Sequence, residues 1–375
     1  MIPYSKQSID TDDIEAVVEV LSSDWLTTGP KVPEFETALA KFVSAKHAVA
    51  VCNGTAALHA AMFALGIGPG DEVILSPMTF ASTANCIVFQ GGTPVFSDVD
   101  PDTLLIDPNL IEDKITTRTK AIITVDYAGQ PCDYDALRNI ATKYGIHLVA
   151  DACHALGARY KDQMVGALAD MTVFSFHPVK HITTGEGGMI VTDNDVLDAR
   201  LRLFRNHGIA TDHKQRNEQG VWFYEMIELG YNYRITDFQC ALGLSQLKKL
   251  PSLIENRRKI ASYYDNAFAS VSAIQPLTVK NQVQHVYHLY VIRLNPDVLG
   301  LNRNDMFHKL RNKGICANVH YIPVHLHPYY RKHFNTHPNL CPVAEKAYDQ
   351  ILSIPIYPAM TDKDIQKIIN VIIKE

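Results

Sequence analysis

Between residues 47 and 205, short runs of apolar and β-branched residues alternate with longer segments of helical spacing. The short runs end at turn-forming residues, and the longer segments repeat apolar residues every three or four positions. This alternation is typical of βαβ units and of a mainly parallel sheet covered by helices. We predict about seven strands, at 48–52, 72–75, 94–97, 121–125, 147–151, 171–176 and 189–192. The segments 55–65, 80–90, 133–144 and 195–205 are predicted as the helices between them.

A second unit is predicted after the sheet. Residues 235–249 have a helical pattern, Leu250-Pro251-Ser252 is expected to break it, and 253–268 reads as a long amphipathic connector. Further elements are predicted as strands at 287–294 and 317–321, helices at 304–313 and 362–373, and an ordered loop at 323–342. We therefore expect an α/β protein with a large domain at 1–250 and a smaller C-terminal α/β domain at 251–375.

The amino-acid composition excludes several classes of protein. The 375 residues are 47% apolar, which is enough for a large core, and the net charge of −5 argues against a nucleic-acid partner. No apolar run is long enough to span a membrane, and the first residues lack the pattern of a secretory signal, so we expect a cytoplasmic protein with no membrane partner. The seven cysteines include no Cys-x-x-Cys pair, and the sixteen histidines lack regular ligand spacing. No metal site is predicted.

Lys180 is the leading candidate for chemistry. It lies between a Ser-Phe-His turn and the glycine-rich run 184–188, downstream of Asp151, which ends a predicted strand. A lysine amine forms a Schiff base with the aldehyde of pyridoxal phosphate, and a carboxylate beside the pyridine nitrogen keeps that nitrogen protonated. The alternative is a solvated loop lysine. The neighbouring glycines favour a close approach of the backbone to a ligand, which a solvated loop does not require.

Two further segments fit the same cofactor. Residues 52–57 place a strand end, a glycine and Thr55 directly before a helix, where free amides attract a phosphate; an ordinary turn with Thr55 as N-cap is the alternative. Ser175 could add a hydroxyl to that phosphate. Phe80 follows another strand end and could stack on a planar ring or pack in the core. Asp151 should emerge at the same sheet edge, where a pyridinium N–H would give this buried acid a partner.

Together these segments resemble the DegT/DnrJ-type sugar aminotransferases, which are pyridoxal phosphate enzymes of fold type I. The resemblance covers nearly the whole chain, at residues 25–30, 53–58, 77–82, 151–155, 174–188 and 230–234. It implies a large domain with a mixed, mainly parallel seven-stranded sheet. It also implies that the N-terminal arm, residues 1–30, contacts the substrate.

The resemblance implies a role for individual residues. Lys180 would bind the cofactor and move the proton, and Asp151 would pair with the pyridine nitrogen. Phe80 would stack on the ring with His154 nearby, while Thr55, Ala56 and Ser175 would hold the phosphate. Asn232 would reach the cofactor phosphate of a neighbouring subunit in a homodimer with two interfacial sites. The residues implied to face the nucleotide sugar are Tyr4, Leu26, Thr27, Thr28, Gly29, Thr55, Ser175, Asn232, Asn318, His320 and Tyr321.

Within the family, residues 125–129, 175–177 and 241–249 are most similar to the transaminases of pseudaminic acid biosynthesis. That similarity implies transfer of an amino group from L-glutamate to C4 of a UDP-linked 4-keto-6-deoxy-N-acetylhexosamine. An enzyme that aminates UDP-4-keto-arabinose or another keto sugar would share many of these residues. Some relatives carry histidine in place of the Schiff-base lysine and are dehydratases, and here lysine holds that position between His177 and His181. A cofactor-binding regulator without turnover is the alternative from another class.

Overall fold

The computed structural model describes residues 1–211, 216 and 220–374. Its centre is a seven-stranded sheet, and the prediction of a mixed, mainly parallel sheet is confirmed. β9 is antiparallel to both of its neighbours, while the other described pairs are parallel. The strands lie in the order β1 (His47–Val51), β9 (Gly188–Thr192), β8 (Met171–Ser175), β5 (His147–Asp151), β4 (Thr119–Val125), β2 (Glu72–Leu75) and β3 (Thr93–Phe96).

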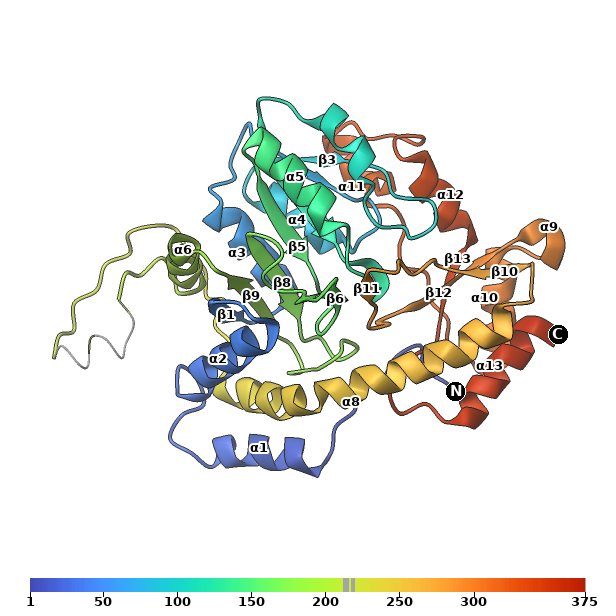
Figure 1. The fold of residues 1–375 in the computed structure, drawn as a ribbon. Coiled ribbons are helices and arrows are strands. Elements are labelled where there is room, and N and C mark those ends of the chain that lie inside the picture. The colour runs from blue at the N-terminus through green and yellow to red at the C-terminus, as the bar shows by residue number, and fades with distance from the viewer. Residues whose placement is uncertain (212–215, 217–219, 375) are drawn as a thin grey trace.

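Helices cover the sheet, as Figure 1 shows, with α5 above the strands in that view and α1, α2 and α8 below them. The four helices predicted between strands are confirmed to within about two residues at each end. They are α3 (Gly54–Ala64), α4 (Ala81–Phe89), α5 (Tyr134–Tyr144) and α6 (Asp195–Arg205). Two helices that the sequence analysis did not assign precede the sheet, α1 (Thr11–Leu21) and α2 (Lys31–Val43). Short 3-10 turns lie at η1 (Pro108–Leu110), η2 (Glu112–Lys114) and η3 (Tyr127–Gly129).

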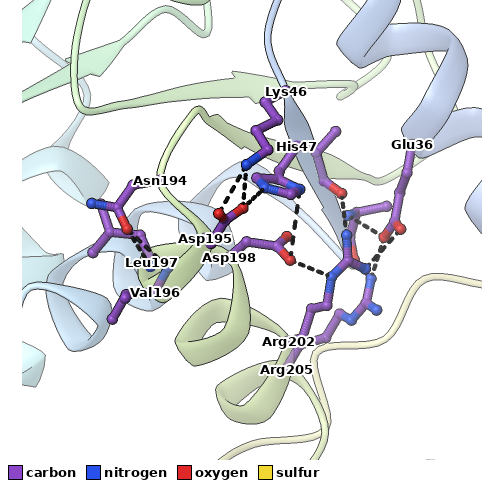
Figure 2. A network of polar contacts seen from close by, with 12 residues as sticks. Glu36, Lys46, His47, Asn194, Asp195, Val196, Leu197, Asp198, Arg202 and Arg205 are labelled. Carbon is purple, nitrogen blue, oxygen red and sulfur yellow. Dashed lines mark hydrogen bonds and ion pairs between the residues drawn. The ribbon is translucent and has the colours of Figure 1, made fainter.

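Glu36 on α2 fastens the first strand to two helices, as Figure 2 shows. Its buried carboxylate accepts from the Ala50 amide at 2.9 Å, from Arg202 at 2.9 Å and from Arg205 at 2.5 Å. Burial alone would raise the pKa of Glu36, but the two arginines outweigh it and hold that pKa below its usual value. This ion-pair cluster fixes β1, whose end leads directly into the turn before α3.

α8 (Asp237–Phe268) is one continuous helix, so the predicted break at Leu250-Pro251-Ser252 is wrong. Pro251 removes one backbone hydrogen bond, but its ring faces solvent, and Leu250 and Ile254 beside it are buried at 0% and 5% exposure. The Ser252 hydroxyl also donates to the Lys249 carbonyl at 2.8 Å. Packing of the flanking residues therefore outweighs the lost hydrogen bond.

The C-terminal part contains a second sheet of three antiparallel strands, β10 (Ile274–Pro276), β12 (Tyr290–Leu294) and β13 (Ile351–Ile354). The helices predicted here are confirmed as α10 (Arg303–Asn312) and α13 (Asp362–Lys374), and β12 is shorter than predicted. Elements that were not predicted are β10, β13, α9 (Pro296–Leu299), α12 (Pro342–Gln350), and a small sheet of β6 (Arg159–Tyr160), β7 (Gln163–Met164) and β11 (Val283–Gln284). The domain boundary at residue 250 stays a prediction, since α8 runs through it.

Two segments of the C-terminal part differ from the prediction. Residues 317–321 are not a strand: only Asn318 pairs with Ser353, and the Asn318 side chain takes the next amide, that of Val319, at 2.8 Å. The local side-chain bond competes with a longer ladder. The predicted loop 323–342 contains two short helical elements, η4 (Val324–Leu326) and α11 (Pro328–His333).

A projecting ribbon leaves the body at the left of Figure 1. It consists of the described residues 206–211 and 220–234, which are joined by bridges from Asn206 to Asn232 and from Ile209 to Met226. Its surface is apolar, with Trp222 exposed at 86% and Leu229 at 69%. Over the described residues, no helix is both long and apolar enough to cross a membrane.

Candidate active site

The carboxyl ends of β1, β2, β4, β5 and β8 meet at one edge of the large sheet, because these strands run in the same direction. Ligands of open α/β sheets bind at this edge. Asn53, Asp126, Asp151 and Ser175 all lie there, at or directly after a strand end. The sequence prediction that these segments converge is therefore confirmed for the strands that carry them.

The turn between β1 and α3 has the geometry of an anion cradle. Asn53, not Thr55, caps the helix, and its side chain accepts from the Ala56 amide at 2.8 Å. The first-turn amides of Gly54 and Thr55 have no partner within the helix and point along its positive end. A Cβ on Gly54 would lie 2.9 Å from the Ser175 Cβ, so glycine here is required by the close approach of the Ser175 strand end. The turn thus brings Thr55 and Ser175 together.

Asp151 lies at the end of β5 with 6% exposure. One carboxylate oxygen accepts from the Thr83 hydroxyl at 2.7 Å, and the other accepts from the Cys153 amide at 3.2 Å. Thr83 is in turn 2.7 Å from the Thr79 hydroxyl. The carboxylate is therefore held in one orientation by two elements, β5 and α4.

Lys180 lies in the loop between β8 and β9, partly buried. Burial lowers the pKa of its amine, and the Cys153 thiol and the Asp151 carboxylate oppose that shift. The positive charge of Lys180 also contributes to lowering the pKa of His154 and of His320. These mutual effects place the amine in one neighbourhood with Asp151 and both histidines, and a lowered pKa favours the neutral, nucleophilic form.

Tyr321, from the C-terminal part of the chain, lies beside these residues. The Tyr321 hydroxyl is 3.1 Å from Nε2 of His154, and the Tyr321 ring centroid is 6.3 Å from that of Phe80. Phe80 itself is 61% exposed, so the core alternative for this residue is wrong. An exposed aromatic face beside a buried carboxylate suits a planar ligand.

The N-terminal arm reaches the same region. The ring of Tyr4 lies 5.6 Å from that of His320, and the Tyr4 carbonyl accepts from the Ile356 amide at 3.1 Å. His320 is 8% exposed, with Nδ1 at 2.9 Å from the Ser353 hydroxyl and Nε2 at 3.3 Å from the Asn318 amide nitrogen. Tyr4, Asn318, His320 and Tyr321 thus form one surface next to the cofactor candidates.

Two groups of predicted site residues, the loop 26–29 and Asn232, lie away from this site within one chain. The loop 26–29 is exposed and is held by α8 instead, where the Gly29 amide donates to Asp237 at 2.8 Å and Thr27 bridges to Thr236. Asn232 is exposed at the base of the projecting ribbon. Among the described residues, no hydrogen bond or ring contact joins either group to Lys180, Ser175 or Phe80.

Two residues at the site were missed by the sequence analysis. Thr83 lies three positions after Phe80, one helical turn along α4, a spacing that could have identified it. Asp126 follows β4 with 0% exposure and accepts from the Tyr134 hydroxyl at 2.7 Å and the Cys132 amide at 2.9 Å. Burial raises the pKa of Asp126 to about 7. An acidic residue at or directly after a strand end identified Asp151 from the sequence, and the same pattern could have identified Asp126.

The residues of this edge fit pyridoxal phosphate. The turn at Gly54 allows close approach of the backbone and has first-turn amides that can bind a phosphate. The oriented Asp151 carboxylate can accept from a ring N–H, and the exposed Phe80 ring can stack on the cofactor ring. A cavity of about 430 Å³ lies elsewhere, beside Tyr160 and residues 278–283, and none of the predicted site residues lines it. In the described part of the chain no cluster of His, Cys, Asp and Glu has the geometry to hold a metal ion.

A parallel-sheet edge with a buried acid, a lysine of lowered pKa and a phosphate cradle defines a cofactor-dependent transferase of the aminotransferase fold. The chain belongs to the DegT/DnrJ/EryC1/StrS aminotransferase family, whose model matches residues 7–373. It is a sugar aminotransferase of that family. The predictions of fold and enzyme class are confirmed.

Individual relatives agree over the full length. SpsC of Bacillus subtilis, a spore coat polysaccharide biosynthesis protein, is 43% identical over 373 residues, which cover 99% of this chain and 96% of that protein. PseC of Helicobacter pylori, an aminotransferase of pseudaminic acid biosynthesis, is 34% identical with a TM-score of 0.93, covering 100% of this chain and 98% of its own. Spr1654 of Streptococcus pneumoniae, named as a sugar aminotransferase and solved in a PMP form, is 34% identical with a TM-score of 0.93, covering 99% and 98%.

Proposed function

We propose that the protein transfers an amino group from L-glutamate to C4 of a UDP-linked 4-keto-6-deoxy-N-acetylhexosamine, the step used in pseudaminic acid biosynthesis. The observation that carries the reaction type is the meeting of Lys180 and the oriented Asp151 carboxylate at one sheet edge. The cofactor is pyridoxal 5′-phosphate, as in this family. It supplies an aldehyde that takes up the amino group and a ring that accepts electrons from the reacting carbon.

Different residues of the chain would bind the cofactor and transfer the proton. Asp151, held by Thr83, would accept the pyridine N–H and keep the ring nitrogen protonated. The amides of Gly54 and Thr55 and the Ser175 hydroxyl would bind the phosphate, with Ala56 behind them at the cap. Phe80 and Tyr321 would cover the ring and exclude water, with His154 orienting the Tyr321 hydroxyl.

Lys180 would bind the cofactor covalently and then, released as a free amine, move a proton between the two carbons that exchange the amino group. A tethered base acts efficiently because it is always within reach of both carbons. Its lowered pKa supports this role, since a protonated ammonium cannot accept a proton. Lysine at this position also favours amino transfer over the dehydratase reaction of histidine-bearing relatives.

Tyr4, Asn318 and His320 would face the sugar together with Tyr321. They lie next to the cofactor candidates but belong to the arm and the C-terminal part, so they can differ among relatives without disturbing the chemistry. Similarity to PseC supports the pseudaminic acid substrate. Similarity to SpsC, at higher identity, favours a second candidate, the keto sugar of a coat polysaccharide.

A homodimer with interfacial sites is part of the proposal. The projecting ribbon exposes Trp222, Met226 and Leu229 at 65% or more, an apolar surface that water disfavours and a second copy would cover. Asn232 at the base of that ribbon would then reach the partner's cofactor phosphate, and the loop 26–29 the partner's sugar. Sedimentation of the purified protein measures the mass: a monomer at micromolar concentration would contradict this assembly.

The substrate is tested with the protein in its pyridoxamine form. It is challenged separately with UDP-4-keto-6-deoxy-L-N-acetylaltrosamine, with UDP-4-keto-arabinose and with no sugar, and return of the pyridoxal absorbance is followed. Fast return with the first sugar alone is expected. Return with the second alone would move the enzyme to arabinose modification. Return with neither would reject both sugars, while bleaching of the pyridoxal form by L-glutamate would still separate an aminotransferase from a regulator.

A further inference from the structure

A small cavity lies behind the lysine loop, and three separate segments form its walls. It has a volume of about 10 Å³, close to the lower limit for holding one water-sized particle. The N-terminal arm, the loop between β8 and β9, and α8 contribute most of its lining. The lining residues are Lys6, Gln7, Ser8, Pro178, Lys180, His181, Thr183, Gln246, Leu253, Arg257 and Pro358.

The charges around this cavity are all positive. Lys6 and Arg257 are the cations among its lining residues, Lys180 adds an amine, and no aspartate or glutamate lines it. Asp13, which accepts from the lining residue Gln246 at 2.6 Å, is already paired with Lys249 at 2.7 Å. A lining of cations without an acid attracts an anion.

Arg257 is the strongest single feature of the cavity. It is 1% exposed, and one of its terminal nitrogens donates to the carbonyls of Ile356 at 2.9 Å and Tyr287 at 3.2 Å. Its Nε has no hydrogen-bond partner, and no carboxylate in the described part of the chain forms an ion pair with it. Burial without a counter-charge lowers the pKa of Arg257 to about 10. A buried charge of this kind is costly unless something compensates it.

His181 adds a second buried polar atom to the wall. Its Nε2 donates to the Val286 carbonyl at 3.2 Å, and its Nδ1 has no partner. Burial, followed by the charges of Arg257 and Lys180, lowers the pKa of His181 well below its usual value. In the neutral ring Nδ1 is an acceptor, because Nε2 carries the proton. An anion beside the ring would offset those two charges and favour the protonated ring, in which Nδ1 donates as well.

We infer that this cavity is a binding site for a small monovalent anion of the halide class, with chloride as the physiological ion. A volume close to that of one water-sized particle favours a monatomic anion over a carboxylate-bearing amino acid or a phosphate. Arg257 supplies the charge and the unpartnered donor. Neither Gly54 nor Ser175, the residues of the cofactor cradle, lines this cavity.

The anion would join three segments that serve the active site. The arm is already attached on both sides of the cavity, since the Ser5 hydroxyl donates to the Val179 carbonyl at 3.3 Å and Gln246 donates to the Ser8 carbonyl at 2.8 Å. The arm also carries Tyr4, and the loop carries Lys180. A bound halide would therefore hold the substrate arm, the reactive lysine and α8 in one arrangement.

Direct detection uses bromide, which scatters anomalously, in crystals of the cofactor-bound enzyme. An anomalous peak in the cavity within about 3.5 Å of the Arg257 guanidinium is expected. Water density without an anomalous peak at high bromide would overturn the proposal. This measurement needs no variant and no turnover.

Solution measurements use the cofactor-bound enzyme in sodium chloride, sodium bromide or sodium gluconate at equal ionic strength. Chloride and bromide are expected to raise the unfolding temperature saturably, by a few degrees, relative to gluconate. Arg257→Met should lose this difference. Arg258→Met is the matched control, because Arg258 is the next residue of α8 and donates to the His285 carbonyl at 3.0 Å without lining the cavity. No difference in the wild type, or an equal difference in Arg257→Met, would count against the site.

Discussion

The Tyr321 hydroxyl lies 3.1 Å from Nε2 of His154, across 167 residues of chain. This contact joins the C-terminal part of the molecule to the segment after β5, three positions beyond Asp151. Burial lowers the pKa of His154 well below its usual value and raises that of Tyr321, so both groups are neutral near pH 7. The hydrogen bond is therefore one between neutral partners, at the place where we propose that sugar and cofactor meet.

Tyr321→Phe removes this bond and keeps the ring. A neutral hydrogen bond contributes about 0.5–1.5 kcal/mol, so kcat/KM for the keto sugar is expected to fall about 2- to 13-fold. Tyr329→Phe serves as the control, because Tyr329 lies in the same segment and is 49% exposed. Steady-state rates with the sugar varied provide the measurement, and equal rates for wild type and Tyr321→Phe would show that the contact has no part in the reaction.

Lys180→Ala should lower multiple turnover more than about 10³-fold, because it removes both the covalent link and the proton carrier. The fold should persist, as measured by circular dichroism and the unfolding temperature. Lys120→Ala, at an exposed position of β4, should keep wild-type rates. Borohydride reduction followed by mass spectrometry should find the cofactor on the peptide of Lys180 in the wild type. Attachment elsewhere would refute the assignment.

Asp126 predicts a pH dependence of stability. Its pKa is raised by burial to about 7, whereas an aspartate in an unfolded chain titrates near ~3.9. Between these values the unfolded chain releases a proton that the folded chain keeps. The free energy of unfolding therefore falls as pH rises through this window, by ~4 kcal/mol at most, and is level above it.

Asp126→Asn should remove this contribution and flatten the curve between pH 4 and 7. Urea unfolding at four pH values measures it, and Asp162→Asn, at an exposed loop position, is the control. A slope that is the same in Asp126→Asn and wild type would mean that another group titrates in this range.

Glu36→Gln should destabilise the protein by about 3–5 kcal/mol, because it leaves two arginines facing a neutral partner in a buried place. Because the pKa of Glu36 is lowered in the fold, this stabilisation is present above the pKa of an ordinary glutamate and is lost as pH falls below it. The difference between variant and wild type should therefore shrink in acid. Asp195→Asn, in the exposed pair with Lys46 shown in Figure 2, should leave stability unchanged.

The large sheet could be predicted because its strands are short, buried and β-branched, and because glycine or acidic residues end them. The same logic found Asp151 and Ser175, which are next to those ends. It could not find the partnership of Tyr321 with His154, since no local pattern encodes a contact across 167 residues. The prediction of a helix break at Pro251 was wrong for a related reason. Local propensity disfavours proline in a helix, whereas the packing of Leu250 and Ile254 that outweighs this propensity is a tertiary effect.

The cap of α3 illustrates a finer limit. Both Asn53 and Thr55 are good capping residues, and the sequence alone does not choose between them. The structure selects Asn53, because the strand ends one residue earlier than predicted and the helix begins at Gly54. A shift of one residue decides which amides remain free for an anion.

The unbroken course of α8 has a consequence for motion. At about 1.5 Å per residue its 32 residues span roughly 48 Å, from α1 and α2 at one end to the C-terminal strands at the other. The helix continues through Pro251, although a proline inside a helix suggests a break. The second half of this rod shares one core with the C-terminal strands, because Ile260, Tyr264 and Phe268 pack in the same cluster as Tyr290 and Ile354. Any movement of those strands over the sheet edge would therefore carry the rod with it.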